Sequence, residues 1–565
     1  MPNYHGFDKV ATIPNKRTKL DSLSYEKKMT INEGDLRPVY FQEVLPGMMI
    51  HLRDAFSIKN IPSPLKSVID DAYLDISYFF VPRRLLWKDW EPFIGADATP
   101  DAYTDPTSYE EPVCLITHSY AGGVGLGSVM NDFGIPSNLP NKAEVSPFPF
   151  AAFSFVWNEF YRDESIQDEN PLHQIVFNMD SGDKLDFGQA GYQWLYLNNQ
   201  VAFNSVNKYH DVFTSLLPSP QKGDPVTLPL GTEAPIKNSY TVYSTRLVNN
   251  TNSDIAADQT IILGEGVLAN RSSGIEWVGL DDGETTALGY KIGISGSDFA
   301  SGLKADLTNA TSATINDLRL AFAAQAYLEA LARGGSRYTE LLHQMFGVSP
   351  SDARLQRPEF LGTLHKRLSF TSVASTNGVP DTLTASVTNR PTGSLGGYSV
   401  TGGDQDVFFK QFEEHGYVIG LASIRVRHTY GQGIPKIFLK KDRFDYWSKF
   451  FDRIGEVPVD KREIYAGGSG SLGFQEAWYE YKYHANEVSG AIAPQGSADM
   501  VAYTYSDNLA AEPTLSSDFI RETRDNIDQT LIGASGVPQY VLDLYHQVTA
   551  IVPLSVTSVP AGIGF

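Results

Sequence analysis

The sequence predicts a mainly β protein with long loop insertions and a few helices. Short runs rich in aromatic and β-branched residues are cut by Pro and Gly, which is typical of strands in an all-β fold. Long stretches of Thr, Ser, Asn, Gly and Asp separate these runs, as surface loops do. No repeat of fixed period runs along the 565 residues, which argues against solenoids and propellers.

The first predicted strands lie at residues 35–56 and 72–82, where apolar side chains occupy at least one face. A short helical segment follows at residues 83–95, and Pro92 ends it early. We expect the strands of the core to come mainly from residues 30–90 and 405–565.

Helices are predicted at three places. Residues 151–170 carry an apolar stripe formed by Phe153, Val156, Trp157 and Phe160. Residues 316–346 contain two more helices, with Asn316 and Ser336 as predicted N-caps and with Gly334–Gly335 and Gly347 as terminators. The sequence Ser-Pro-Ser-Asp at residues 349–352 specifies a further turn.

Two later segments alternate strictly and are predicted strands. "GYVIGLASIRVRHTY" (416–430) places Ile424, Val426 and His428 on one face, and "WYEYKYH" (478–484) has tyrosines on one face. Two polar stretches, residues 224–310 and 372–404, are predicted to lie at the surface because they are rich in Thr, Ser, Asn and Gly.

Charge divides the chain unevenly. The formal net charge is −21, from 45 Lys and Arg against 66 Asp and Glu, so the chain as a whole repels polyanions. Residues 1–30 differ, because six cations face three anions there: Lys9, Lys16, Arg17, Lys19, Lys27 and Lys28 against Asp8, Asp21 and Glu26. Either this is a functional basic arm on an acidic body, or it is a solvated terminus.

Length and composition bound the class of protein. A chain of 565 residues exceeds a single ordinary core, so it has several domains or one core with long insertions. It has no apolar run long enough for a membrane span and no apolar signal segment, so we expect no membrane insertion and synthesis in a cytoplasm. Cys114 is the single cysteine, which excludes an intrachain disulfide.

No motif supports catalysis, a cofactor or a metal. The sequence lacks HExxH, GxSxG and a phosphate-binding GxxxxGK[ST] loop. Gly468, Gly470 and Gly473 have GxGxxG spacing but precede a strand pattern, so a hairpin loop is predicted. The acidic stretch at residues 280–286 lacks the spacing of a calcium loop and is predicted to be a solvated turn.

Four arginines are predicted to make docking contacts. Arg333, Arg337, Arg354 and Arg357 lie at or near helix ends, and their forked guanidinium groups suit bidentate pairing with carboxylates of a neighbouring segment or subunit. These arginines could also bind phosphate. A different class, a glycan-binding or glycan-cleaving β protein, is suggested by 29 Tyr, 7 Trp and many short strands.

Several long motifs resemble the major capsid protein of the gokushoviruses, small single-stranded DNA bacteriophages of the microvirus group (Microviridae). They occur in order along the chain: "EVLPG" (43–47), "YLDISYFFVPRRLLWKDWEPFIG" (73–95), "WNEFYRDESIQDEN" (157–170), "LPSPQKGDPV" (217–226), "ARGGSRYTELL" (332–342), "SPSDARLQRPEFLG" (349–362) and "EHGYVIGLASIRV" (414–426). The segments "LHKRLSFTSVAS" and "TSVPAGIGF" depart from the family pattern.

The resemblance implies a viral jelly-roll β-barrel whose copies assemble into an icosahedral T=1 capsid around circular single-stranded DNA. It implies a basic arm at residues 1–30, the first part of the jelly roll with helical excursions at 31–223, a threefold protrusion at 224–310, and the remainder at 311–565. The implied role is structural, in the virion, with assembly in the bacterial cytoplasm and no enzyme activity or cofactor.

The implied partners are further copies of the chain, packaged DNA and a small basic DNA-binding protein. A scaffolding protein, a DNA pilot protein and a host-surface receptor, with a glycan as one candidate, complete the set. The predicted contacts with DNA or the basic protein are Lys16, Arg17, Lys19, Lys27 and Lys28; the predicted assembly contacts are Arg333, Arg337, Arg354 and Arg357.

Overall fold

The computed structural model describes residues 17–94, 109–116, 125–187, 192, 195, 204–224, 226, 236–238, 278–279, 289–290, 303–305, 315–334, 337–374, 395–452, 454–496, 498–533 and 536–554. The chain divides into two compact units. The first combines Met1–Lys222 with Leu328–Phe565, and the second is Gly223–Tyr327.

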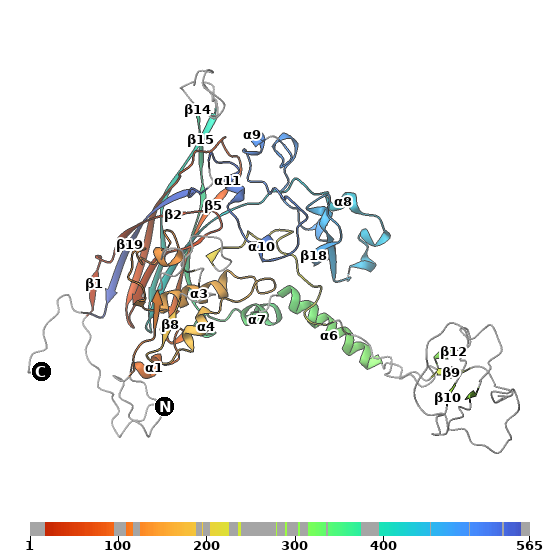
Figure 1. The fold of residues 1–565 in the computed structure, drawn as a ribbon, viewed down its shortest axis with the longest axis horizontal. Helices are drawn as coiled ribbons and strands as arrows, with labels where there is room; N and C mark the ends of the chain where they lie inside the picture. The colour runs from red at the N-terminus through yellow and green to blue at the C-terminus, as the bar shows by residue number, and fades with distance from the viewer. Residues whose placement is uncertain are drawn as a thin grey trace, which may run out of the picture. The chain divides into compact units, whose positions relative to one another are not determined.

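Two antiparallel sheets form the centre of the first unit (Figure 1). The larger sheet has the order β1 (Thr18–Leu20), β19 (Tyr540–Val552), β4 (Met49–Asn60), β15 (Leu395–Gln411) and β14 (Phe370–Ala374), with β2 (Tyr25–Ile31) also paired to β19. The smaller sheet has the order β13 (Glu359–Leu368), β5 (Ala72–Pro82), β16 (Gly416–Val426) and β3 (Leu36–Val44). Long antiparallel strands with long insertions confirm the predicted mainly β, jelly-roll class, although neither sheet closes on itself.

The main core lies between the two sheets. In β4 and β19 every second side chain is buried, as a strand with one solvated face requires. The inward side chains of both sheets join in one apolar cluster that includes Leu52, Ile76, Val418 and Leu544. At Gly420 of β16 an added Cβ would lie 2.5 Å from the Tyr78 ring, so only glycine allows this close approach.

The two central strands of the smaller sheet, β5 and β16, are buried on both faces. Strands β5 and β16 have almost no exposed residue, and their second face packs against α3 (Phe148–Phe160) in a separate apolar cluster. Trp157 of α3 is buried there, and its indole nitrogen donates to the Ser205 carbonyl at 3.0 Å. The helix therefore covers the sheet, as its apolar stripe predicts.

Apart from α6, the remaining described helices are short. The helices are α1 (Trp90–Phe93), α2 (Val129–Asp132), α4 (Leu172–Phe177), α6 (Ile315–Gly334), α7 (Tyr338–Phe346), α8 (Lys436–Leu439), α9 (Ala498–Val501), α10 (Ser517–Ile520) and α11 (Asp525–Asp528). The 3-10 helices are η1 (Arg83–Leu85), η5 (Arg443–Asp445), η6 (Lys449–Phe451), η7 (Lys461–Glu463), η8 (Tyr479–Tyr481) and η9 (Gly490–Ile492).

Four small sheets complete the described strands. In the first unit, β6 (Val113–Ile116) lies between β7 (Ala143–Val145) and β8 (Lys184–Asp186), and β17 (Glu456–Asp460) pairs with β18 (Ser471–Glu476). In the second unit, β9 (Ile236–Asn238) pairs with β12 (Leu303–Ala305), and β10 (Val278–Gly279) with β11 (Gly289–Tyr290). Most of the predicted protrusion at residues 224–310, and all of the acidic stretch at 280–286, lie outside the described residues.

Several local predictions were wrong. The predicted strand at residues 478–484 is the 3-10 helix η8, because Trp478 has a left-handed backbone (φ 68°) that breaks an extended chain. The helix predicted over 151–170 ends at Phe160, and α6 begins at Ile315, before the predicted cap Asn316. β13 and the first part of β15 lie outside the ranges from which core strands were expected.

Candidate functional site: a buried charge cluster and an arginine corner

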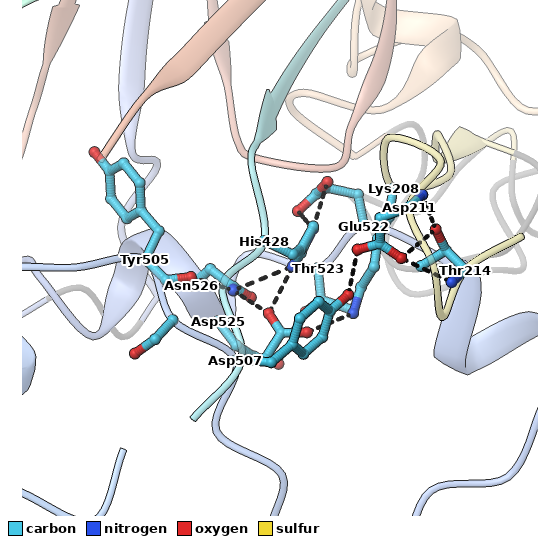
Figure 2. A network of polar contacts seen from close by, with 12 residues as sticks. Lys208, Asp211, Thr214, His428, Tyr505, Asp507, Glu522, Thr523, Asp525 and Asn526 are labelled. Atoms are coloured by element: carbon cyan, nitrogen blue, oxygen red, sulfur yellow. Dashed lines mark hydrogen bonds and ion pairs between the residues drawn. The ribbon is translucent and has the colours of Figure 1, made fainter. Parts of the chain in front are cut away.

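A buried charge cluster surrounds His428, two residues beyond the end of β16 (Figure 2). Its Nδ1 lies 2.6 Å from Asp507 Oδ1, and its Nε2 lies 3.1 Å from the Glu522 carboxylate. Lys208 approaches the other oxygen of Asp507 at 3.1 Å, and the Asn526 amide donates to Asp507 at 2.6 Å. We call these five residues the His428 cluster.

Electrostatics in the His428 cluster favour two cations and two anions. A neutral imidazole has one N–H, so contacts of both ring nitrogens with carboxylates require the protonated ring. Although burial lowers the pKa of His428, the Glu522 and Asp507 carboxylates outweigh it and raise that pKa to about 9. The pKa of Asp507 is lowered despite its burial, because His428 and Lys208 favour its charged form.

Glu33 adds a fifth ionisable group beside the cluster. Burial and the neighbouring Glu522 raise its pKa well above the ordinary value. Its Oε2 accepts a hydrogen bond from the Ile527 amide at 2.9 Å. Two basic side chains, Lys208 and His428, thus meet two acidic ones, Asp507 and Glu522, next to Glu33.

The His428 cluster joins segments that lie far apart in the sequence. His428 follows β16, Glu33 precedes β3, Lys208 belongs to the segment 204–224, and the other residues lie in the segment 498–533 before β19. Each partner is buried or nearly so. The cluster therefore holds the segments 204–224 and 498–533 against the end of β16 and the start of β3.

The predicted arginines make contacts between elements of one chain. Arg337 lies 2.8 Å from Glu164. Its guanidinium donates to the backbone carbonyl of Asn158, in the last turn of α3, at 2.7 Å, and to that of Arg162, just beyond α3, at 3.0 Å. Arg333, at the end of α6, pairs with the buried carboxylate of Glu456 in β17. Both arginines tie helices α6 and α7 to neighbouring segments.

Arg357 and Arg354 differ although they are three residues apart. Arg357 donates to Asp352 at 2.7 Å and lies 4.7 Å from the centre of the Phe160 ring in α3. Arg354 is exposed. Three of the four predicted arginines therefore hold elements of one protomer together, and Arg354 presents its side chain to solvent.

The cations predicted to contact DNA or the basic protein also differ in exposure. Lys16 lies outside the described residues. Arg17 is exposed, Lys19 lies 3.6 Å from Asp21 at the surface, and Lys28 is exposed in β2 beside Glu26. These side chains are accessible to a partner.

Lys27 points into the protein instead. Its ammonium donates to the backbone carbonyls of Pro38 and Asp132, at 2.7 and 2.5 Å. Burial lowers the pKa of Lys27 to about 8. In this conformation Lys27 holds β2 against β3 and α2, so its ammonium group is not available to DNA or the basic protein.

The described residues show no metal-binding arrangement, in that no group of three or more His, Cys, Asp or Glu side chains could hold an ion. Cys114 is buried, which raises the pKa of its thiol. Among the described helices none has the length and apolar character needed to cross a bilayer.

Comparison with known proteins decides the class. The sequence matches the family described as capsid protein (F protein) over residues 9–562, nearly the whole chain. The chain belongs to this family. The family and the relatives that match are structural capsid proteins, so this is a capsid protein and not an enzyme. The glycan-cleaving alternative is therefore rejected.

Relatives along the full length confirm the resemblance to gokushovirus capsid proteins. The chain is 31% identical to capsid protein VP1 of Bdellovibrio phage phiMH2K, covering 100% of this chain and 98% of that protein. It is 33% identical to capsid protein VP1 of Spiroplasma virus 4, covering 94% and 92%. It is 31% identical to capsid protein VP1 of Chlamydia phage 1, covering 98% and 97%. This capsid protein is accordingly a component of a virion.

Proposed function

We propose that copies of this capsid protein assemble into a small icosahedral shell with one subunit per asymmetric unit, enclosing a circular single-stranded DNA genome. The full-length match to phage capsid proteins carries the proposal. The two-sheet sandwich supports it, because both sheets and their covering helix form within one protomer. Assembly is expected in the cytoplasm of the bacterial host.

Expression tests this proposal. The chain is produced alone, then with the small basic protein and the scaffolding and DNA pilot proteins of the same genome, and the products are examined by sedimentation and electron microscopy. We expect closed particles of uniform size in at least one condition. A stable monomer under every condition would contradict assembly as the function.

The accessible N-terminal cations are the proposed contacts with packaged DNA or the basic protein. Arg17, Lys19 and Lys28 are exposed, which supports this role for them. Replacing Lys16, Arg17, Lys19 and Lys28 by Ser should lower the DNA content of purified particles, because each phosphate contact contributes to binding. Full DNA content in such particles would argue against it.

Lys27→Met is the matched control for this test. Since the Lys27 ammonium is bonded inside the protomer, its loss should alter the stability of the protomer and leave the DNA content of assembled particles unchanged.

The insertion at residues 224–310 is proposed to face outward, near the threefold axes, and to contact the host surface, with glycans as one candidate receptor. Its polar composition supports a surface position. A compact unit spans Gly223–Tyr327, which supports removal of residues 230–305 without loss of the sandwich. The deletion should abolish attachment to host cells and preserve particles; attachment by deleted particles would refute the proposal.

Arg354 is proposed to contact a neighbouring subunit, because its side chain is exposed beside the folded corner of Arg357. Arg354→Ala should lower particle yield and the heat resistance of particles. Unchanged yield and heat resistance would remove Arg354 from the interface.

A further inference from the structure

A short segment of the first unit leaves large apolar side chains in water. Residues 436–452, here the aromatic segment, contain α8, η5 and η6. Five of its aromatic side chains are 52 to 94% exposed: Phe438, Phe444, Tyr446, Trp447 and Phe450. Ile437 is 70% exposed beside them.

The exposed area is large for a free surface. With about 200 Å² for a fully exposed ring, these five rings leave on the order of 700 Å² in water. The largest apolar patch on a typical monomer is about 300–600 Å², and each partner of a stable interface contributes about 800 Å². The exposed ring area of the aromatic segment is therefore close to what one partner contributes to a specific interface.

The aromatic segment is nevertheless anchored and locally ordered. Its Lys440 ammonium is buried and lies 2.7 Å from Glu480, over the Tyr481 ring. The Trp478 indole donates to the Phe451 carbonyl at 3.1 Å. Asp445 accepts from the Lys441 and Asp442 amides, at 2.7 Å each, which closes a tight turn. Polar anchors hold the backbone while the rings remain largely exposed.

A recess adjoins the exposed rings. A pocket of about 770 Å³ is lined by Trp447, Trp478 and Tyr481 together with Asp452 and Lys482. Trp447 belongs both to the exposed set and to this wall. A projecting ring at Phe450 and a recess at Trp447 give the surface relief that a protein partner can match.

We propose that the aromatic segment is an interface between protomers, and that its partner is a second copy of this chain. The inference rests on the proposed assembly function and identifies one surface that carries it. A capsid protein meets other copies of itself at close range, and the exposed area is what an interface between copies requires. Aromatic side chains are also the ones enriched at the centres of interfaces.

Single-stranded DNA is the competing occupant, because bases stack on exposed aromatic rings. Such sites combine the rings with a positively charged groove. Here Lys436 and Lys440 are paired with Glu463 and Glu480 of the same chain. The segment has three other cations, Lys441, Arg443 and Lys449, and also three aspartates, so its charge is balanced in number and suits protein better than phosphate.

The test replaces the two most exposed rings, Phe438 and Phe450. The variant F438S/F450S and the control F450L are produced in the condition in which the wild type assembles, and the protomer concentration at which particles form is measured by sedimentation. Circular dichroism and thermal melts of unassembled protomers check folding. We expect the double variant to need at least about 30-fold more protomer, which corresponds to about 2 kcal/mol, the loss expected from a single central aromatic contact. F450L, which keeps an apolar side chain, should assemble within a few-fold of the wild type.

Assembly of F438S/F450S at the wild-type concentration would overturn this inference while leaving the assembly function intact. Failure of the wild type itself to assemble would instead remove the function on which the inference rests. Binding of a labelled oligothymidine to unassembled protomers tests single-stranded DNA as the competing occupant. Equal binding by wild type and F438S/F450S is expected; loss of binding with assembly retained would assign the surface to nucleic acid.

Discussion

The His428 cluster and the aromatic segment differ in where their side chains find partners. In the cluster, His428 and Asp507 are almost fully buried, and every charge faces an opposite charge from a distant part of the same chain. In the aromatic segment, only anchors such as Lys440 are buried, and Phe450 is 94% exposed. The two regions lie only a few residues apart in the sequence.

This difference separates two requirements of a subunit that must fold before it assembles. Buried charges that lack partners are costly, so the cluster has to be completed within one protomer. Apolar rings at an interface remain in water until a second copy arrives, and their burial then drives association. Stability of the protomer should therefore depend on the first region, and association on the second.

The largest expected effect is on the cluster. Asp507→Ala leaves the charges of His428 and Lys208 buried without their shared carboxylate, and should lower the free energy of unfolding of the protomer by about 3–5 kcal/mol. Urea unfolding of unassembled protomers measures this. Asp404→Ala is the control, because its ion pair with Arg53 is exposed and solvent screening leaves such a pair little effect on stability. Equal losses in the free energy of unfolding for both variants would contradict the stabilising role of the His428 cluster.

The next effect is a dependence of stability on pH. The pKa of His428 is about 9 in the folded protein, against 6.5 for a free histidine in the unfolded chain. The stability that His428 adds to the fold is therefore fully present below pH 6.5 and is lost as the pH rises through 9. The free energy of unfolding should fall by on the order of 3 kcal/mol over this window.

His428→Gln provides the reference for that measurement. The difference between wild type and variant cancels other titrating groups, including Lys27, whose lowered pKa of about 8 acts in the opposite direction. A difference that stays constant from pH 6.5 to 9 would show that His428 is not a buried cation.

A smaller difference in protomer stability is expected between the Arg357 and Arg354 variants. Arg357→Ala removes the bond to Asp352 and the contact with Phe160 and should cost the protomer about 1–2 kcal/mol. Arg354→Ala should change protomer stability by less than about 0.5 kcal/mol, because the side chain is exposed. Urea unfolding of both variants decides; equal costs would place Arg354 in a contact of the protomer.

The smallest expected effect is in the aromatic segment. Phe450→Ser should leave the free energy of unfolding of the protomer within about 0.5 kcal/mol of the wild type. A loss of several kcal/mol in the same urea experiment would show that Phe450 belongs to the core of the protomer.

Much of the sandwich was predictable from local patterns. Alternation placed His428 on the face of Ile424 and Val426, and the residue is indeed buried although β16 ends at Val426. The same pattern misled at residues 478–484, since alternating tyrosines do not show the left-handed backbone of Trp478. Short-range periodicity therefore predicts which face a residue occupies better than it predicts whether the chain is extended.

The partners within the site were not predictable. Asp507 and Glu522 are acidic residues in a polar C-terminal segment, and nothing local distinguishes them from solvated carboxylates. Their role depends on contacts across 79 and 94 residues. Likewise, the abundance of Phe and Tyr suggests core residues, and only the structure shows that those of residues 436–452 lie at the surface. The signal that could have indicated this is the mixture of Lys, Arg and Asp with the rings.

Hydrogen exchange in protomers and in assembled particles tests the central distinction most directly. Amides around His428 and residues 505–526 should be protected to the same degree in both states, because their contacts are complete in one chain. Amides of residues 436–452 should exchange readily in the protomer and become protected in the particle. Unchanged exchange of the aromatic segment on assembly, or new protection around His428, would contradict the account.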